Sequence, residues 1–431
     1  MSILTLRSFC LWLALALSLA LPLRSAHAAD YRILHQFCAD QVNCLDGFDL
    51  SAPLVRDAQG NLYGTASGGG AFGGGTIFRL SPKAGGKWKL DVLHDFCAKT
   101  GCTDGFAPTG ALILDQQGNL YGVTAADVKA EDGDSVVYRL RRNGKHWDYE
   151  VLFEFCHGRT CDGVGAQAAL AYVGQSTGTP YDGVSPLFGV AGGGGAHANG
   201  VAFMLVPQNG QWTHTDLYDF CALASCADGG GPNQPLIVED ALNLVGVGSL
   251  GGKGGGGVVF RLSSQDGKTW SESVVHAFCS LPGCADGASP NSLAIDPAGN
   301  LFGTTQSGGK CTDLFACGTL FEIAPDGTET VLFDFCKKVG GCDVGSDPGA
   351  GVVVGADGTL YGTTLSGGAG DVGLIYAFDG TMKRLHSFCG TGCQFGGNVR
   401  SPMILDPQGH LFGVTPQGDT SGGGVVFELT P

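Results

Sequence analysis

The stretch LHDFCAKTGCTDGFAPTGALILDQQGNLYGVT, from Leu93 to Thr124, decides the fold because close copies of it occur seven times. When the first cysteine of each copy is aligned, neighbouring copies lie 53 to 65 residues apart. These cysteines are Cys38, Cys97, Cys156, Cys221, Cys279, Cys336 and Cys389. A regular period of this length is the signature of a repeat architecture, in which each copy forms one supersecondary unit.

Four segments of the second copy have the character of β-strands. Residues 111–115 (ALILD) form a short apolar run, typical of a buried strand, and a tight turn leads to LYGV at 120–123. After a variable loop come the alternating segments 136–140 and 147–155, joined by a turn at Asn143-Gly144. We name these strands a, b, c and d. A four-stranded antiparallel unit that is repeated radially is a blade of a β-propeller.

The two ends of the repeat region predict how the ring closes. Tyr31 to Phe37 has the pattern of a strand d with no strands a, b or c before it, and the chain ends at Pro431 just after a strand c. We therefore predict an all-β, seven-bladed propeller of four-stranded antiparallel blades, in which the N-terminal strand completes the last blade. An open solenoid is the alternative, but it would leave two unpaired edge strands. The repeats begin near residues 31, 90, 149, 214, 272, 329 and 382.

The first 28 residues have the features of a secretory signal peptide. Arg7 precedes an apolar run over residues 9–21, and Ala26-His27-Ala28 provides a small-x-small cleavage pattern. The run is too short to span a bilayer, so we predict a signal peptide over 1–28, a single propeller domain over 29–431 and no membrane span. Because the chain ends inside a blade without an anchor, we expect it to be secreted or periplasmic.

The cysteines support export independently. Of the 17 cysteines, all except Cys10 fall into close pairs. A zinc site needs about four converging ligands, whereas these pairs lie on separate repeats, so disulfides are favoured in an exported protein. The predicted pairs are Cys38 with Cys44, Cys97 with Cys102, Cys156 with Cys161, Cys221 with Cys226, Cys279 with Cys284, Cys311 with Cys317, Cys336 with Cys342 and Cys389 with Cys393.

Composition limits the kinds of partner. The chain has 74 glycines, 43% hydrophobic residues in regular short runs and a formal net charge of −16. The hydrophobic runs argue for a packed chain and not a disordered one. The acidic charge argues against nucleic acid and anionic membranes as partners. We expect a monomer.

Several repeated residues have structural interpretations. A glycine in every strand b is expected to let a neighbouring sheet approach closely. Histidine in strand d alternates with aromatic residues at the equivalent position, which indicates packing and not catalysis. Four tryptophans that open strands d could stack on sugars, but packing at a strand edge is the favoured interpretation; they are Trp88, Trp147, Trp212 and Trp270.

Strand order predicts which loops share a face. The d-to-a loops, which carry the cysteine pairs, and the b-to-c loops, which carry glycine runs, should lie together on what we call the long-loop face. The shorter a-to-b and c-to-d turns lie on the opposite face, the turn face. The third repeat departs from the pattern with an enlarged a-to-b segment over 173–186. A ligand site is expected on the long-loop face, near the mouth of the central channel.

Candidate binding residues are few. An aspartate after the second cysteine could hold Ca²⁺, although Asp-Gly is also an ordinary turn signal. No other cofactor is predicted. These aspartates are Asp46, Asp104, Asp162, Asp228, Asp286 and Asp343. In the third repeat, His157, Arg159 and His197 lie on loops of the candidate face, where solvated loop residues are the alternative. We predict no catalytic residues, because no nucleophile elbow, carboxylate pair or phosphate loop stands out.

The pattern FCxxxxCxDG, followed by a short apolar strand and DxxGNLYGTT, resembles the Gloeobacter/Verrucomicrobia-type tandem repeat, or Gloeo/Verruco repeat. Residues 61–65 (NLYGT), 119–122 (NLYG), 300–305 (NLFGTT) and 358–364 (GTLYGTT) carry this resemblance. It implies an exported bacterial repeat protein, frequently with a C-terminal surface anchor that this chain does not have. The resemblance brings no activity and no catalytic residues.

The leading hypothesis is an exported, non-enzymatic binding or interaction module whose ligand is a carbohydrate or a cell-surface polymer. The alternative is a propeller enzyme, such as a glycan lyase, hydrolase or lactonase, with its site at the channel mouth. An enzyme should bring two or more titratable side chains from different repeats together at the mouth, whereas a binding module need not. A structural envelope protein is the third hypothesis.

Overall fold

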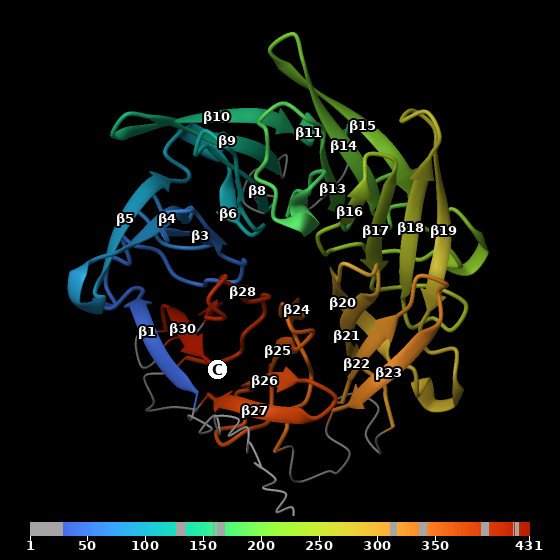
Figure 1. Cartoon of the computed structure of the whole chain (residues 1–431). Helices are drawn as coiled ribbons and strands as arrows, with labels where there is room; N and C mark the ends of the chain where they lie inside the picture. Colours follow the sequence, from blue (N-terminus) through green and yellow to red (C-terminus); the bar gives the residue numbers. More distant parts are fainter. Residues whose placement is uncertain are drawn as a thin grey trace, which may run out of the picture.

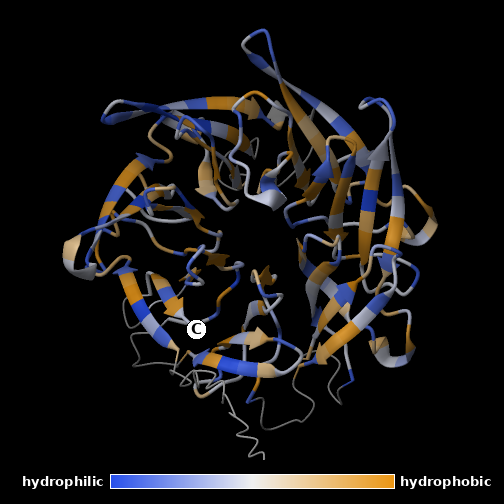
Figure 2. Cartoon of the chain, viewed as in Figure 1, coloured by the Kyte–Doolittle hydropathy of each residue, from blue (hydrophilic) through white to orange (hydrophobic). Residues whose placement is uncertain are grey.

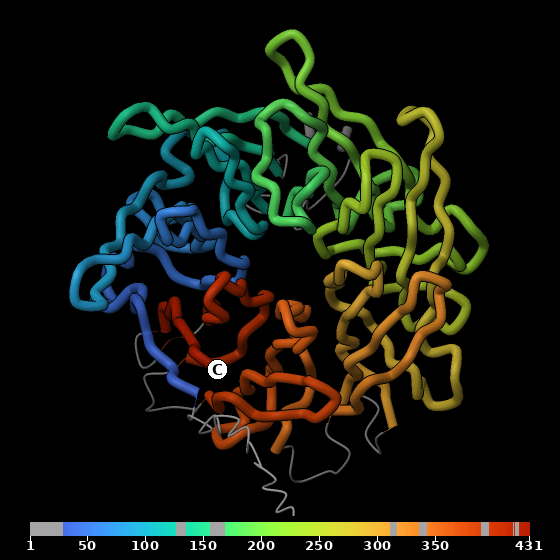
Figure 3. The backbone as a smooth tube through the Cα atoms, viewed as in Figure 1, coloured from blue at the N-terminus to red at the C-terminus, as the bar shows by residue number. Residues whose placement is uncertain are grey.

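The computed structural model describes residues 29–125, 135–157, 160–161, 169–310, 317–335, 343–388, 396–416, 418 and 422–431. Seven small antiparallel sheets stand in a ring, and the chain passes once around it, as Figure 1 and Figure 3 show. The predicted all-β, seven-bladed propeller is confirmed. The signal peptide predicted over 1–28 lies outside the described residues.

Each blade is numbered after the repeat that supplies its strands a, b and c, which run outward from the channel. Blade 1 has β2 (Val55–Arg56), β3 (Leu62–Ala66), β4 (Thr76–Pro82) and β5 (Trp88–Asp95). Blade 2 has β7 (Ile113–Leu114), β8 (Leu120–Ala125), β9 (Val136–Asn143) and β10 (His146–Glu154), with β6 (Phe106–Pro108) also paired to β8. Blade 3 has β13 (Leu187–Ala191), β14 (Val201–Gln208) and β15 (Gln211–Asp219), and its strand a is reduced to one bridge between Ala171 and Phe188.

The other four blades are regular. Blade 4 has β16 (Ile237–Asp240), β17 (Asn243–Gly248), β18 (Val258–Ser264) and β19 (Trp270–Ala277), and blade 5 has β20 (Ala288–Ile295), β21 (Leu301–Ser307), β22 (Thr319–Ile323) and β23 (Glu329–Asp334). Blade 6 has β24 (Val353–Val354), β25 (Leu360–Thr364), β26 (Leu374–Phe378) and β27 (Met382–Ser387). Blade 7 has β28 (Ile404–Leu405), β29 (Leu411–Thr415), β30 (Val425–Thr430) and β1 (Asp30–Gln36).

Short elements occupy the loops. A hairpin of β11 (Cys156–His157) and β12 (Thr160–Cys161) follows blade 2. The 3₁₀ turns are η1 (Ala84–Gly86), η2 (Thr100–Cys102), η3 (Gln175–Thr177), η4 (Ala224–Cys226) and η5 (Pro282–Cys284). No helix in the described part of the chain is long and apolar enough to cross a membrane.

The two ends of the chain close the ring. β1 pairs antiparallel with β30, so that Tyr31 lies opposite Leu429, and the blue and red strands are adjacent in Figure 1. The ring of Tyr31 also stacks on His386 of blade 6, with the ring centroids 4.0 Å apart. The predicted pairing of the N-terminal strand with the last blade is therefore confirmed.

The cores lie between neighbouring blades. One cluster, for example, combines Leu34 and Phe412 of blade 7 with Leu62 and Phe78 of blade 1. Strand b is buried along its whole length in blades 1, 3 and 7, because it is covered on both faces of its sheet. The outer strands alternate between hydrophobic and hydrophilic residues, as Figure 2 shows, because one of their faces meets solvent.

The strand-b glycines make room for an aromatic ring. A Cβ on Gly64 would lie 2.6 Å from the ring of Phe78, and a Cβ on Gly246 would lie 2.5 Å from the ring of Phe260. Each ring belongs to the strand c that pairs with the glycine in the same sheet. The expected close approach is thus present, but the group that approaches is a ring of the same sheet and not a neighbouring sheet.

The histidines of strand d pack between blades. Tyr149 of blade 2 stacks on His94 of blade 1 with ring centroids 4.1 Å apart, and His214 of blade 3 stacks on Phe153 of blade 2 at 4.8 Å. Burial lowers the pKa of His94 to about 4, so the imidazole is neutral at pH 7. The packing interpretation of this position is confirmed. The four strand-opening tryptophans pack against the inter-blade cores, also as predicted.

Candidate functional site

The long-loop face forms as the strand order predicts. The d-to-a loop and the b-to-c loop of a blade are joined by a hydrogen bond in which a glycine N–H donates to the carbonyl of the second cysteine. Gly70 donates to Cys44 at 2.9 Å, and Gly252 donates to Cys226 at 2.9 Å. The same bond recurs in blade 5. The repeated sequence therefore gives the same contact between the two loops in blades 1, 4 and 5.

Four of the predicted disulfides join cysteines whose side chains are described, and all four are formed: Cys38–Cys44, Cys97–Cys102, Cys221–Cys226 and Cys279–Cys284. Cys317 is also disulfide-bonded, and its predicted partner Cys311 lies outside the described residues. The backbones of Cys156 and Cys161 lie opposite each other in the β11–β12 hairpin. The pairs Cys336–Cys342 and Cys389–Cys393 lie outside the described residues.

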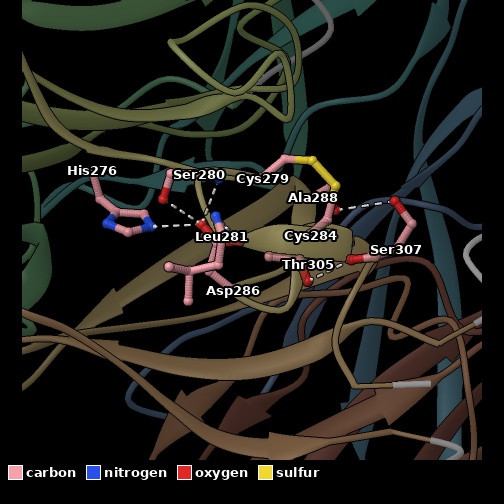
Figure 4. Close-up of a disulfide and its surroundings, with 9 residues drawn as sticks. All are labelled: His276, Cys279, Ser280, Leu281, Cys284, Asp286, Ala288, Thr305 and Ser307. Carbon is pink, nitrogen blue, oxygen red and sulfur yellow. Dashed lines mark hydrogen bonds and ion pairs between the residues drawn. A yellow bond between two sulfur atoms is a disulfide. The ribbon is translucent and has the colours of Figure 1, made fainter.

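The aspartate after the second cysteine holds its own loop together. The Asp286 carboxylate accepts the backbone N–H groups of Ser280 and Leu281, at 2.9 and 3.3 Å, and the Ser280 hydroxyl at 2.8 Å, as Figure 4 shows. Asp104 and Asp228 accept the equivalent N–H groups of their loops. All three are almost completely buried. These contacts give the three carboxylates a structural role within their own loops.

The other members of the aspartate set differ. Asp46 accepts the Cys38 N–H at 3.0 Å and lies 3.0 Å from His35 Nε2. Asp343 is exposed, and Asp162 lies outside the described residues. The cluster of Cys38, Asp40 and Cys44 has the spacing of a metal site, but its two sulfur atoms are joined in a disulfide. Binding of Ca²⁺ by the aspartates stays a prediction.

The described residues do not show a site formed by the three candidates of the third repeat, His157, Arg159 and His197. His197 is exposed on the b-to-c loop of blade 3, where its carbonyl accepts the Asn199 side-chain N–H at 2.8 Å. His157 belongs to β11, of which only the backbone is described, and Arg159 lies outside the described residues. Their role in binding stays a prediction.

The central channel is apolar. A cavity of about 450 Å³ is lined by residues from the inner edge of all seven blades, among them Val55, Ile237, Leu293, Val353 and Ile404. The polar residues of this lining are two serines and one glutamine, and no titratable side chain belongs to it. The described residues that line this cavity therefore include no pair of acid and base groups.

Two glutamates carry perturbed pKa values away from this channel. Burial, and then the charge of Asp228, raises the pKa of Glu272 to about 7. Burial, and then the charge of Asp286, raises the pKa of Glu329 to about 7. A general acid often titrates in this range. However, both glutamates lie on outer strands, and neither lines the channel or the polar pocket described next.

A polar pocket of about 550 Å³ lies on the turn face. Two of its walls are the a-to-b turns of blades 1 and 2, over residues 57–59 and 115–118, and Arg142 near the end of β9 joins them. A third wall comes from Tyr172 and from the beginning of the enlarged segment of the third repeat, through Gln175, Gly178 and Pro180. Aliphatic residues of the inner strands form the rest of the lining.

The enlarged segment is fixed to the neighbouring blades. The Gln116 N–H donates to the Tyr181 carbonyl at 2.9 Å, and the Tyr181 ring makes an edge contact with Tyr121 at 5.2 Å between centroids. Tyr181 is completely buried, and its hydroxyl donates to the Ser185 carbonyl at 2.6 Å. On the other side of the enlarged segment, the turn η3 contacts β16 of blade 4. The segment, green in Figure 1, thus lies at the inner edge of the ring.

The aspartate that opens each pocket turn uses all of its acceptor capacity. One oxygen of Asp115 accepts the N–H groups of Gln117 and Asn119, at 2.9 and 2.8 Å, and the other accepts the Asn119 amide at 2.8 Å and the Tyr121 hydroxyl at 3.1 Å. Asp57 makes the same four contacts in blade 1. These contacts explain why aspartate, asparagine and tyrosine recur at a fixed spacing in DxxGNLY.

Sequence reasoning missed these turns as part of a site. The constant spacing of Asp57 to Asn61 and of Asp115 to Asn119 was the available signal, because a carboxylate before a Gly-Asn turn is the acceptor that such a turn needs. The arginines Arg56 and Arg142 gave no signal, since neither lies in a repeated motif.

The comparisons with known proteins concern the repeat and the fold. The family model described as the Gloeobacter/Verrucomicrobia repeat matches residues 24–186 and 174–346. No curated protein matches the sequence. An ancestral GH74 enzyme has a similar structure, with a TM-score of 0.54 and 13% identity over 89% of this chain and 48% of that chain. This chain therefore corresponds to about half of that enzyme.

Two other solved structures are more distant. The phage phi92 endosialidase gives a TM-score of 0.44 at 10% identity, over 93% of this chain and 68% of that chain. The β-propeller domain of the Trilobed protease from Pyrococcus furiosus gives 0.42 at 9% identity, over 89% and 94%. At such low identities, the similarity of the GH74 structure shows the fold alone.

Proposed function

This chain belongs to the Gloeobacter/Verrucomicrobia repeat family, and from that premise we propose that it is an exported, non-enzymatic binding module whose ligand is a carbohydrate or another cell-surface polymer. The polar pocket on the turn face is the observation that carries the proposal. This location differs from the long-loop face on which loop length predicts the site, because Asp104, Asp228 and Asp286 of that face are bonded within their own loops.

The chemistry of the pocket suits a polar ligand. Its volume lies within the range of ordinary ligand sites, and it combines the aromatic ring of Tyr172 with the amides of Gln116 and Gln117 and the guanidinium of Arg142. Aromatic rings can cover the apolar face of a sugar, while amide and guanidinium groups can bond its hydroxyl groups. The pocket also contains the carboxylates of Asp57 and Asp115, but each accepts four hydrogen bonds from its own turn, which argues against a role as acid or base in hydrolysis.

Export rests on the cysteines and the N-terminal sequence. Four intact disulfides are typical of proteins that fold in an oxidising compartment, and the predicted signal peptide leads to such a compartment. A secreted or periplasmic location supports a role at the cell envelope, where polysaccharides are abundant.

A glycan array tests the proposal. Purified protein beginning at Ala29 is applied with and without Ca²⁺, beside two variants, Gln59→Trp and Ala298→Trp. Gln59 lines the pocket, whereas Ala298 occupies the same position of the equivalent turn in blade 5, and both side chains are exposed. The proposal predicts glycan binding by the wild type and by Ala298→Trp, and its loss in Gln59→Trp.

Each outcome has a separate meaning. An array with no bound glycan in either buffer contradicts the carbohydrate proposal and favours the structural alternative. Glycan cleavage in place of retention favours the enzyme. Binding that needs Ca²⁺ and survives Gln59→Trp would transfer the site to the aspartates of the long-loop face.

A further inference from the structure

We propose that the pocket on the turn face selects a sugar that carries an anionic group, a carboxylate or a sulfate. This inference rests on the proposed function, because it names the ligand class of the same site. It follows from counting which hydrogen-bonding groups of the pocket are already used and which remain available.

The carboxylate acceptors of the pocket are used. A carboxylate has about four lone-pair positions, and Asp57 and Asp115 each accept four hydrogen bonds from their own turns. The Tyr63 and Tyr172 hydroxyl groups donate to Asp57 and to the Thr179 carbonyl. The two carboxylates therefore have no lone pair left for a hydroxyl group of a ligand.

The cationic donors of the pocket remain available. Arg142 is exposed, and no described residue forms an ion pair or hydrogen bond with its guanidinium. Only its backbone N–H is used, by the Asn119 side chain at 3.0 Å. Arg56 is partly compensated, since its Nη2 lies 3.7 Å from Asp406 and its guanidinium lies 5.9 Å from the Phe412 ring centroid. Its Nε is buried without a hydrogen-bond partner.

A pocket with an unpaired guanidinium and fully bonded carboxylates favours a ligand rich in acceptors. The planar guanidinium of Arg142 can bond two oxygens of a carboxylate or sulfate at once, which a neutral hydroxyl group cannot match. The net charge of −16 opposes any anion at long range, so binding must depend on short-range contacts inside the pocket. An uncharged sugar would leave these donors without charged partners.

The test compares three oligosaccharides of equal length: an oligogalacturonate, a sulfated galactose oligomer and a neutral galactose oligomer. Binding to the mature protein is measured by calorimetry for the wild type, Arg142→Ala and Arg141→Ala. Arg141 is the adjacent, exposed arginine on β9 and does not line the pocket, so it controls for charge alone.

We expect the anionic oligomers to bind wild type and Arg141→Ala alike, and Arg142→Ala to bind them about tenfold more weakly or worse, as for a lost charge-assisted hydrogen bond. Binding of only the carboxylated or only the sulfated oligomer supports the inference and identifies the anion. Equal binding of the neutral oligomer, or equal losses in both arginine variants, overturns it and leaves the carbohydrate proposal intact. Absence of any glycan binding on the array refutes the proposed function itself.

Discussion

The two faces of this propeller use the same repeat in different ways. On the long-loop face, four described cysteine loops are closed by disulfides, and a buried aspartate holds three of them. In blades 1, 4 and 5 the cysteine loop is also bonded to the glycine loop. On the turn face, repeated aspartate turns form a regular base, and one enlarged segment of the third repeat adds a wall to it. The regular repeats thus form the stable ring, whereas the enlarged segment of the third repeat completes the pocket.

The faces also differ in what they show to solvent. Of the eleven large apolar side chains exposed in the described residues, seven lie in loops of the long-loop face: Val42, Leu45, Phe48, Phe72, Leu223, Leu250 and Leu281. The pocket on the turn face presents arginine and glutamine. Exposed apolar side chains thus gather on the long-loop face, whereas the polar pocket lies on the turn face.

The largest expected effect comes from removing the anchor of the enlarged segment. Tyr181→Ala should lower the free energy of unfolding by about 3 kcal/mol, because a fully buried aromatic side chain is replaced by a cavity. Val184→Ala is the matched control, since Val184 is an exposed side chain in the same segment, and it should change stability by less than about 0.5 kcal/mol. Equal unfolding midpoints in urea would mean that the segment is not part of the cooperative fold.

The second prediction concerns the glycine loops of the other face. A Cβ on Gly256 would lie 2.6 Å from the Cys279 Cβ, so Gly256→Ala should destabilise the protein by about 2 kcal/mol through overpacking. Gly192 lies in the corresponding loop of blade 3, where a Cβ would meet its nearest atom at 3.4 Å. Gly192→Ala should therefore be tolerated. Similar melting temperatures for the two variants would refute the tight contact between glycine and cysteine loops.

The smallest expected effect is a pH dependence of the free energy of unfolding, caused by two glutamates on outer strands. Glu272 and Glu329 have folded-state pKa values raised to about 7 by burial and by a neighbouring aspartate. A folded-state pKa above the unfolded value means that ionisation costs stability, so the protein should lose stability as the pH rises from about 4.5 to 7. Because both side chains are partly exposed, the cost is about 1 kcal/mol each after screening is taken into account.

Glu272→Gln and Glu329→Gln should remove that loss. Each variant should be more stable than wild type at pH 8 and equal to it near pH 4.5, as judged by urea unfolding at the two pH values. The Glu272→Gln variant also tests a contact with the long-loop face, because the charge of Asp228 in that face is one cause of the raised pKa of Glu272. A parallel pH profile for variant and wild type would show that these carboxyl groups ionise freely.

Much of the fold could be predicted because it is encoded locally and repeated. Alternating and apolar runs specify strands, their count specifies the blades, and the incomplete repeats at 31–37 and 402–431 specify the closure. The strand-b glycines show the limit of this reasoning. Their need for space was predicted correctly, but the ring that fills it comes from the partner strand, and only the register reveals which residue lies opposite.

The candidate site was less predictable, because its parts are far apart in the sequence. The pocket joins residues near 56, 115, 142 and 175, which belong to different repeats and share no motif. The predicted aspartates of the long-loop face carried a visible repeat signal, yet three of them use their carboxylates within their own loops. A repeated polar residue therefore indicated structure more often than binding.

The sequence by itself determined the seven blades, the closing strand, the pairing of the described disulfides and the division into two faces, because each of these depends on local pattern and on the order of strands. Only the tertiary structure decided where a polar ligand can be held. Whether a donor or acceptor is available depends on which neighbours already bond to it, and those neighbours are brought together by the closure of the ring.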